Sequence, residues 1–116
     1  MNKILQYAGL ATRAGKAFGG GLQTETLIRS GKAKVLILAA DASDNTKKKL
    51  INLADTHHVP VVETGDRESL GRATGKEYRS AVVLTDRGFA DAVLRVGSSN
   101  AADGGKQIDG DKNQSS

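Results

Sequence analysis

The sequence predicts an α/β fold, and two observations carry the prediction. Segments whose apolar residues recur at helical spacing alternate with short, continuously apolar segments of strand type, and only a few residues join one segment to the next. The 116 residues, of which 38% are hydrophobic, suffice for one hydrophobic core and one domain. The alternation indicates a mostly parallel sheet with helices on both of its faces.

Two helices are expected in the first thirty residues. The first spans residues 2–14, with Asn2 as its cap, and Gly15 ends it. The second spans residues 21–30 and ends at Gly31, because glycine readily adopts the left-handed conformation that closes a helix. The apolar side of the first helix comprises Ile4, Leu5, Ala8, Ala11 and Thr12, and that of the second comprises Leu22, Leu27 and Ile28.

Strands and helices alternate through the rest of the folded part. Residues 35–40 are continuously apolar, as in a central strand that is covered on both faces. Ser43 or Asp44 can cap the helix that follows, and Asp66 begins the next helix, which ends at Gly75. We expect strands at residues 35–40, 60–62 and 80–85, and helices at about residues 44–54, 66–75 and 89–96.

The C-terminal segment differs in composition from the rest of the chain. In residues 97–116 Ile108 is the single large apolar residue, among glycine, serine, asparagine, aspartate and lysine. Such a segment buries too little surface to offset the entropy of ordering. We therefore expect a folded domain at residues 1–96 and a disordered polar tail at residues 97–116.

Composition excludes several classes of protein. Without cysteine the chain has no disulfide frame, no thiolate nucleophile and no zinc–thiolate site. No apolar run approaches the roughly 18 residues of a membrane span, and the N-terminus lacks a secretory signal, so we expect a cytoplasmic protein without a membrane partner. Two phenylalanines and two tyrosines are too few for an RNA-recognition-motif surface, which stacks bases on several aromatic side chains.

Positive charge is concentrated at the start of the chain. Residues 1–34 hold six lysines and arginines against one glutamate, for a net charge of +5. Residues 35–96 balance at nine against nine, and residues 97–116 hold two against three. A localised basic region on a small domain favours a polyanion, usually nucleic acid, as the partner.

A cluster of three glycines at residues 19–21 lies within this basic region. If the segment after it is a helix, the first backbone N–H groups are unobstructed and can receive a phosphate. Lys16 precedes the cluster, and Arg29 and Lys32 follow it. The alternative is a plain loop, in which glycine supplies a positive φ and nothing binds.

The sequence does not match the motifs of nucleotide-binding, metal-binding or catalytic sites. Gly15-Lys16 is followed by Ala17, where a Walker loop needs a hydroxyl, and a dinucleotide fingerprint needs glycine at Thr24. Adjacent histidines at residues 57–58 point in different directions on a helix, and no further histidine completes a metal site. Acid pairs such as those at residues 41 and 44 lack a nucleophile with a base. We therefore expect no enzyme activity, no nucleotide, no metal and no cofactor.

Two motifs and their order along the chain identify a family resemblance. Asp-Ala-Ser-x-Asn-Thr stands at residues 41–46, and Thr-Asp-x-Gly-Phe-Ala stands at residues 85–90. With the segments 20–29, 31–43, 59–61 and 70–76, they resemble the kink-turn-binding ribosomal proteins of the large-subunit seven-Ae/thirty-e type, most closely the bacterial YlxQ-type branch. The resemblance covers nearly all of residues 1–96.

This resemblance implies a three-layer α/β/α sandwich with a mixed four-stranded sheet, and an RNA-binding role without catalysis. We expect a monomer that binds structured RNA in association with the ribosome. In the family, the RNA site combines the start of the second helix with the loop before the last strand. Carried over by position, the site comprises Gly20, Gly21, Leu22, Gln23 and Thr26 in the helix and Lys76, Glu77, Tyr78 and Arg79 in the loop.

The start of the second helix differs from that of family members with well-defined kink-turn recognition. Their sequence there resembles Gly-Thr-Asn-Glu, followed two residues later by lysine. Leu22 has no hydrogen-bonding group for a base edge and Thr26 has a short hydroxyl, whereas Gln23 retains an amide that donates and accepts. We expect phosphate attraction to persist and base recognition to be less strict, with Tyr78 as a platform for an extruded base. The alternative is a protein-interaction module with Leu22 as its anchor.

Overall fold

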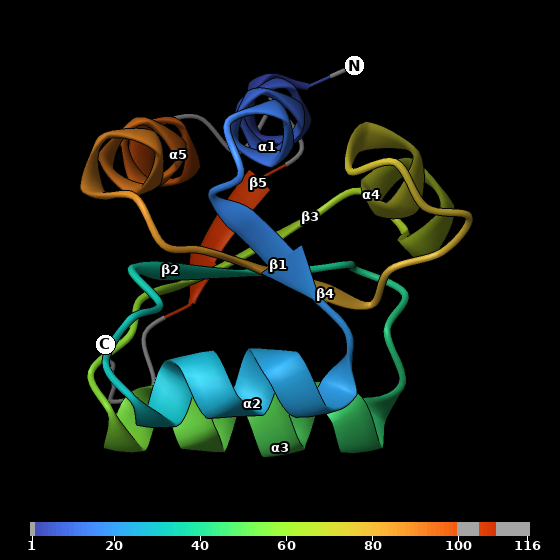
Figure 1. Cartoon of the computed structure of the whole chain (residues 1–116). Helices are drawn as coiled ribbons and strands as arrows, with labels where there is room; N and C mark the ends of the chain where they lie inside the picture. Colours follow the sequence, from blue (N-terminus) through green and yellow to red (C-terminus); the bar gives the residue numbers. More distant parts are fainter. Residues whose placement is uncertain (1, 100–104, 109–116) are drawn as a thin grey trace.

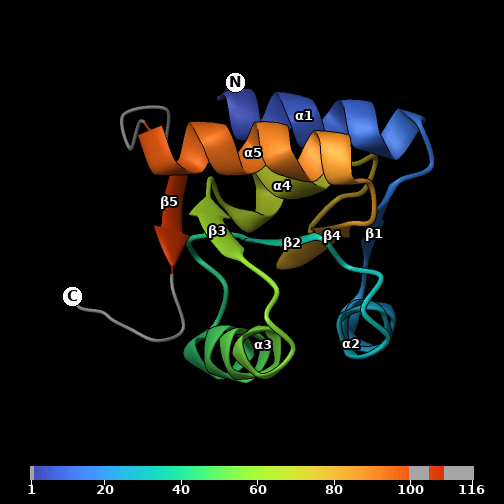
Figure 2. The same cartoon turned by 90° about the vertical axis from the view of Figure 1, so that its left-hand side faces the viewer.

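The structure is a computed structural model that describes residues 2–99 and 105–108. The helices are α1 (Lys3–Arg13), α2 (Gly21–Arg29), α3 (Asp44–Thr56), α4 (Arg67–Ala73) and α5 (Arg87–Ser99). The strands are β1 (Ala17–Gly19), β2 (Val35–Leu38), β3 (Val61–Thr64), β4 (Ala81–Leu84) and β5 (Gly105–Ile108). Helices α1, α4 and α5 cover one face of the sheet, and α2 and α3 cover the other (Figure 1, Figure 2).

The central sheet is mixed, with the strand order β1-β4-β2-β3-β5. Strands β2 and β3 run parallel, whereas β4 is antiparallel to both of its neighbours and β5 is antiparallel to β3. The three-layer sandwich with a mixed sheet that the resemblance implied is therefore confirmed. The mostly parallel sheet predicted from the alternation of elements is wrong, because alternation fixes which faces are covered but not the direction of each strand.

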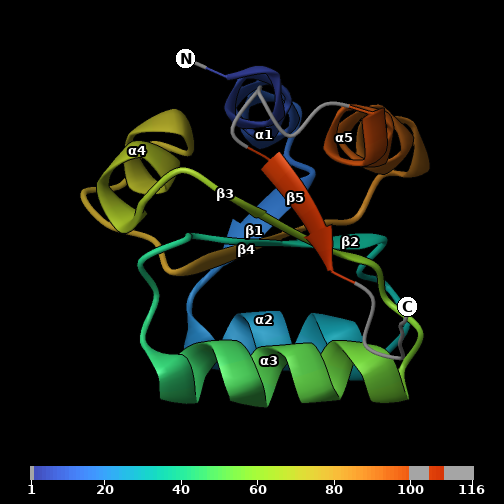
Figure 3. The ribbon, with the colours of Figure 1, turned by 180° about the vertical axis from the view of Figure 1, so that it is seen from behind.

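Two of the five strands lie at positions where no strand was expected. Strand β1 lies in the segment that ends in the glycine cluster, and its backbone pairs with β4 from Ala17↔Leu84 to Gly19↔Val82. At the opposite edge, β5 pairs with β3 as a fifth strand (Figure 3). Backbone pairing at a sheet edge does not depend on an apolar sequence, so composition gave no signal of either strand.

The expected tail boundary needs correction. Residues 97–99 continue α5, and residues 105–108 form β5, so the prediction of disorder from residue 97 onward is wrong at these positions. The remaining tail residues, 100–104 and 109–116, lie outside the described part of the chain.

Alternating residues of the strands build two aliphatic cores, one on each side of the sheet. In β2, Ile37 points toward α1, α4 and α5, while Leu36 points toward α2 and α3. The first core contains Ile4, Leu5, Ala8, Ala11, Val35, Ile37, Ala39, Val62, Leu70, Val82, Leu84, Ala90 and Val93. The second contains Ile28, Ala33, Leu36, Leu38, Leu50, Ala54, Val59, Val61, Ala81 and Val83. Both faces of the sheet are thus buried, which holds the strand ends in fixed positions.

Side chains cap the start of four helices. Asn2 caps α1, Ser43 rather than Asp44 caps α3, and Asp66 caps α4. The carboxylate of Asp86 accepts a hydrogen bond from the first turn of α5. Helix α2 differs, because Gly20 occupies its N-cap and no side chain there accepts a hydrogen bond.

Candidate nucleic-acid interface

The start of α2 presents its first amide groups without a side-chain cap. Gly20 has φ 101° and ψ 146°, a backbone conformation that favours glycine. The first intrahelical hydrogen bond runs from the Thr24 N–H to the Gly20 carbonyl oxygen, at 3.0 Å. The amides of residues 21–23 precede that bond and stand at the positive end of the helix dipole, where an anion is favoured.

The side chain of Arg79 lies directly against the glycine cluster. A Cβ atom placed on Gly19 would come within 2.8 Å of both Nε and Nη1 of Arg79, and one on Gly20 would lie 3.3 Å from Nη1. The absence of a side chain at Gly19 therefore makes room for the guanidinium. Arg79 comes from the segment before β4, so the strand pairing of β1 with β4 brings the two predicted halves of the site together.

A groove of about 250 Å³ lies between these two segments and α3. Beside it, Leu22 and Tyr78 are 79% and 65% exposed, which is unusual for large apolar and aromatic side chains. The groove is lined by Gly20, Gly21, Thr24, Thr46, Leu50, Tyr78, Arg79, Ser80 and Ala81.

Two polar atoms in the lining residues have no hydrogen-bond partner. They are Oγ1 of Thr24 and Nε of Arg79, and within residues 2–97 no other buried side-chain nitrogen or oxygen lacks one. The Thr24 side chain is 1% exposed. Buried polar atoms are normally paired, at a cost of about 1–3 kcal/mol when they are not. Both residues line the same groove.

Most of the residues predicted for the site lie in or beside the groove. Leu22, Gln23 and Thr26 are exposed on one side of α2, because positions three and four apart share a helix face. Lys76 and Glu77 are exposed in the loop of residues 76–79, called the 76–79 loop below. Gly20, Gly21, Tyr78 and Arg79 line the groove itself.

Three predicted cations lie elsewhere. The carbonyl oxygen of Lys16 accepts a hydrogen bond from Thr85, so Lys16 stands at the opposite end of β1 and β4 from Arg79. Arg29 is the last residue of α2, a helix of nine residues and therefore about 13 Å long, and Lys32 follows that far end. These three cations therefore lie toward the end of the sheet away from the groove, and not around the glycine cluster as predicted.

One acid also reduces the positive charge along α2. Glu25 lies 2.7 Å from Lys49 and 3.7 Å from Arg29. The hydrogen bond from Lys49 holds the pKa of the Glu25 carboxyl below its usual range. This part of the surface is therefore less basic than its lysines and arginines suggest.

Several groove residues were not predicted from the sequence. Thr24 lies four positions before Ile28, on the buried side of α2, so its pattern is that of a core residue. Thr46 and Leu50 belong to α3, and they reach the groove through packing that no local motif reveals.

The described residues hold no metal site of the common kind. Nowhere in residues 2–99 and 105–108 do three or more histidine, cysteine, aspartate or glutamate side chains gather as ligands. The Asp41 carboxylate, considered above as one of an acid pair, accepts a hydrogen bond from the Arg67 amide at 2.7 Å. No helix in the described part of the chain has the length and apolar character to span a membrane.

Relatives with known names match most of the chain. RNA-binding protein YlxQ of Bacillus subtilis (strain 168) is 41% identical over 88 residues, which cover 76% of this chain and 88% of that protein. RNA-binding protein YlxQ of Enterococcus faecium is 39% identical over 88 residues, covering 76% and 84%.

Solved structures share the fold. A protein with unknown function from Bacillus halodurans C has a TM-score of 0.79 at 34% identity, covering 83% of this chain and 97% of that chain. The Giardia lamblia 15.5kD RNA binding protein has a TM-score of 0.69 at 22% identity, covering 79% of each chain, and supports the fold alone. The ribosomal protein L7Ae/L30e/S12e/Gadd45 family matches residues 2–94. This match, with the YlxQ relatives and the resemblance of the two motifs, shows that the chain belongs to that family.

Proposed function

We propose that the protein is a non-catalytic RNA-binding protein that recognises structured RNA, of kink-turn or bulged form, in association with the ribosome in the cytoplasm. The observation that carries the proposal is the meeting of uncapped α2 amides with the unpartnered atoms of Thr24 and Arg79 in one groove. Membership of the family, and the RNA-binding names of its YlxQ members, support it.

Each part of the groove suits a different part of an RNA. The amides of residues 21–23 and the helix dipole favour a phosphate. The Arg79 guanidinium donates charge-assisted hydrogen bonds to a phosphate or to a base acceptor. Tyr78, 65% exposed, offers a face on which a base can stack. A kinked or bulged RNA supplies unstacked bases, whereas a continuous duplex keeps its bases stacked, so this arrangement favours the kinked form.

A protein-interaction module is the second candidate function, and the exposure of Leu22 favours it. The side chain is 79% exposed at the start of α2 and has no hydrogen-bonding group to offer RNA. In that function, Leu22 anchors a partner protein on a ribosomal or RNA-processing particle. If Arg79→Ala abolishes RNA binding while association with the particle persists unchanged, this second function is supported.

The RNA-binding proposal is tested by removing one cation from the groove. Arg79→Ala is expected to weaken binding of a kink-turn RNA by about tenfold or more, because hydrogen bonds to charged groups contribute about 1.5–3 kcal/mol. Arg87→Ala is the matched control, since Arg87 lies just beyond the opposite end of β4. Equal losses in the two variants, measured by titration of labelled RNA, would show that charge alone acts and would exclude the groove as the site.

A further inference from the structure

The 76–79 loop is held by the backbone of α4. The Lys76 N–H donates to the Gly71 carbonyl oxygen at 2.8 Å, and the Arg79 N–H donates to the Arg67 carbonyl oxygen at 3.0 Å. A Cβ atom on Gly71 would lie 2.7 Å from the Tyr78 nitrogen, so the loop packs directly on the helix backbone. Any displacement of α4 therefore moves the loop that carries Tyr78 and Arg79.

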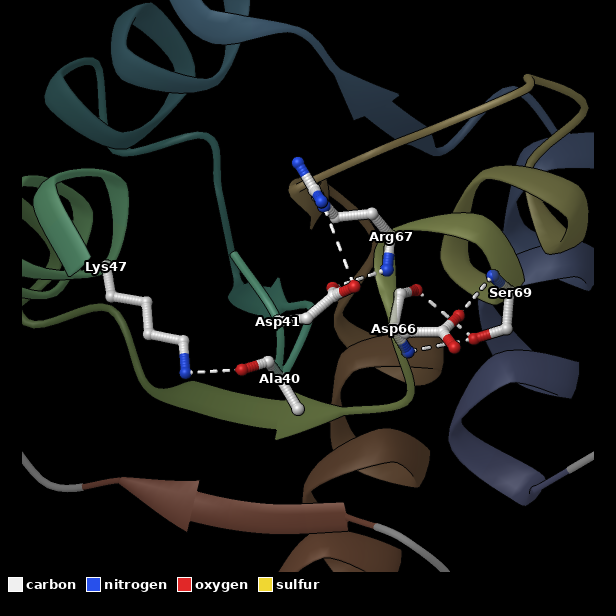
Figure 4. A network of polar contacts seen from close by, with 6 residues as sticks. All are labelled: Ala40, Asp41, Lys47, Asp66, Arg67 and Ser69. Atoms are coloured by element: carbon white, nitrogen blue, oxygen red, sulfur yellow. Dashed lines mark hydrogen bonds and ion pairs between the residues drawn. The ribbon is translucent and has the colours of Figure 1, made fainter. Parts of the chain in front are cut away.

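The first residue of α4 is in turn held by Asp41, which follows β2 (Figure 4). Oδ1 of Asp41 accepts a hydrogen bond from the Arg67 N–H at 2.7 Å, and Oδ2 lies 3.6 Å from Nε of Arg67. The capping box of Asp66 and Ser69 completes this helix start. Helix α4 has seven residues, a length that is marginal without tertiary contacts.

The amide bond, rather than the ion pair, is the stronger of the two Asp41 contacts. The side chains of Arg67 and Asp41 are 52% and 49% exposed, and exposed ion pairs contribute little. The hydrogen bond from the amide is short and charge-assisted, and its donor stands at the positive end of the helix.

We propose that Asp41 is a positioning residue of the RNA interface, an inference that rests on the proposed function. Its carboxylate fixes the Arg67 amide, and the carbonyl of the same residue fixes the Arg79 amide. Asp41 does not line the groove, and the contact that links it to the groove runs through the backbone of α4. Asp41 lies three residues after the end of β2, so its contact with α4 links the sheet to the 76–79 loop.

Three variants separate the two contacts of Asp41. Asp41→Ala removes both contacts, Asp41→Asn keeps an oxygen for the Arg67 amide, and Arg67→Ala removes the guanidinium while leaving the backbone. We expect Asp41→Ala to weaken kink-turn RNA binding by about three- to tenfold, which corresponds to the loss of one hydrogen bond. Asp41→Asn should restore most of this loss, and Arg67→Ala should bind nearly as the parent protein does.

Two further readouts distinguish positioning from RNA contact. Exchange of the Arg79 amide hydrogen, measured in the protein without RNA, should be faster in Asp41→Ala than in the parent. The slope of affinity against salt concentration should be the same in Asp41→Ala as in the parent, because no phosphate contact is removed. In Arg79→Ala the slope should be shallower by the contribution of about one phosphate contact.

The outcomes also separate this inference from the proposed function. Unchanged Arg79 exchange and unchanged RNA affinity in Asp41→Ala would overturn the positioning role. Loss of affinity in Arg67→Ala equal to that in Asp41→Ala would overturn it as well, because the side chain would then be the essential group. If the parent protein binds no kink-turn RNA while Asp41→Ala accelerates Arg79 exchange, the proposed function fails and the positioning of the loop is supported.

Discussion

At the scale of single residues, Thr24 is the most direct test of the proposed RNA groove. Its hydroxyl is buried on α2 and has no hydrogen-bond partner. Valine, which has nearly the same shape, would fill the same space without a polar atom. A buried hydroxyl without a hydrogen bond destabilises the folded protein by about 1–3 kcal/mol. Its presence is explained if RNA supplies the missing partner.

Replacing Thr24 tests this explanation. Thr24→Val removes the hydroxyl and keeps the shape, so the free energy of unfolding should stay the same or rise by about 1 kcal/mol. Affinity for a kink-turn RNA should fall several-fold, by about 1 kcal/mol, because one hydrogen bond is lost. Chemical denaturation and RNA titration measure the two quantities. Full RNA affinity in Thr24→Val would show that the hydroxyl takes no part in binding.

At the scale of elements, the helices were predicted well because their signals are local. The caps Asn2, Ser43 and Asp66 stand within a few residues of the amides that they bind. Strands β1 and β5 were missed, because each forms by pairing with a strand far away in the sequence. The start of α2 could likewise be predicted from its glycines, whereas the α3 wall of the groove, with Thr46 and Leu50, depends on tertiary packing.

The Asp66 cap of α4 should make the stability of this helix, and of the 76–79 loop that it holds, sensitive to acid. Hydrogen bonds from the backbone and hydroxyl of Ser69 hold the pKa of the Asp66 carboxyl below its usual range. A carboxyl with a lowered pKa stabilises the folded state at neutral pH, and this stabilisation is lost as pH falls through the folded-state value. Exchange of the Ser69 and Arg79 amides, corrected for intrinsic rates, should therefore accelerate as pH falls from about 5 toward 2.

Asp66→Asn is the control for that acid sensitivity. Asparagine is also a good N-cap but does not titrate, so it should keep the helix start and remove most of the pH dependence. The same acceleration in acid for Asp66→Asn and for the parent protein would assign the effect to another carboxyl group.

At the scale of the whole molecule, the fold brings the residues of the proposed RNA groove together at one end of the sheet. The end of β1, the start of α2 and the segment before β4 meet there, while Lys16, Arg29 and Lys32 lie toward the other end. Within a net charge of +4, cations thus lie at both ends of the sheet, and they would attract a polyanion to either end. Under the proposed function, the groove at this one end orients the RNA and selects the kinked form.

The most direct test is the affinity for a kink-turn RNA and for a continuous duplex of the same composition, measured across a salt series. We expect tighter binding of the kink-turn RNA at every salt concentration. We also expect the logarithm of the affinity to fall with the logarithm of the salt concentration, with a slope of about −0.7 to −0.9 for each phosphate contact. A flat salt dependence with equal affinity for the two RNAs would contradict the proposed function.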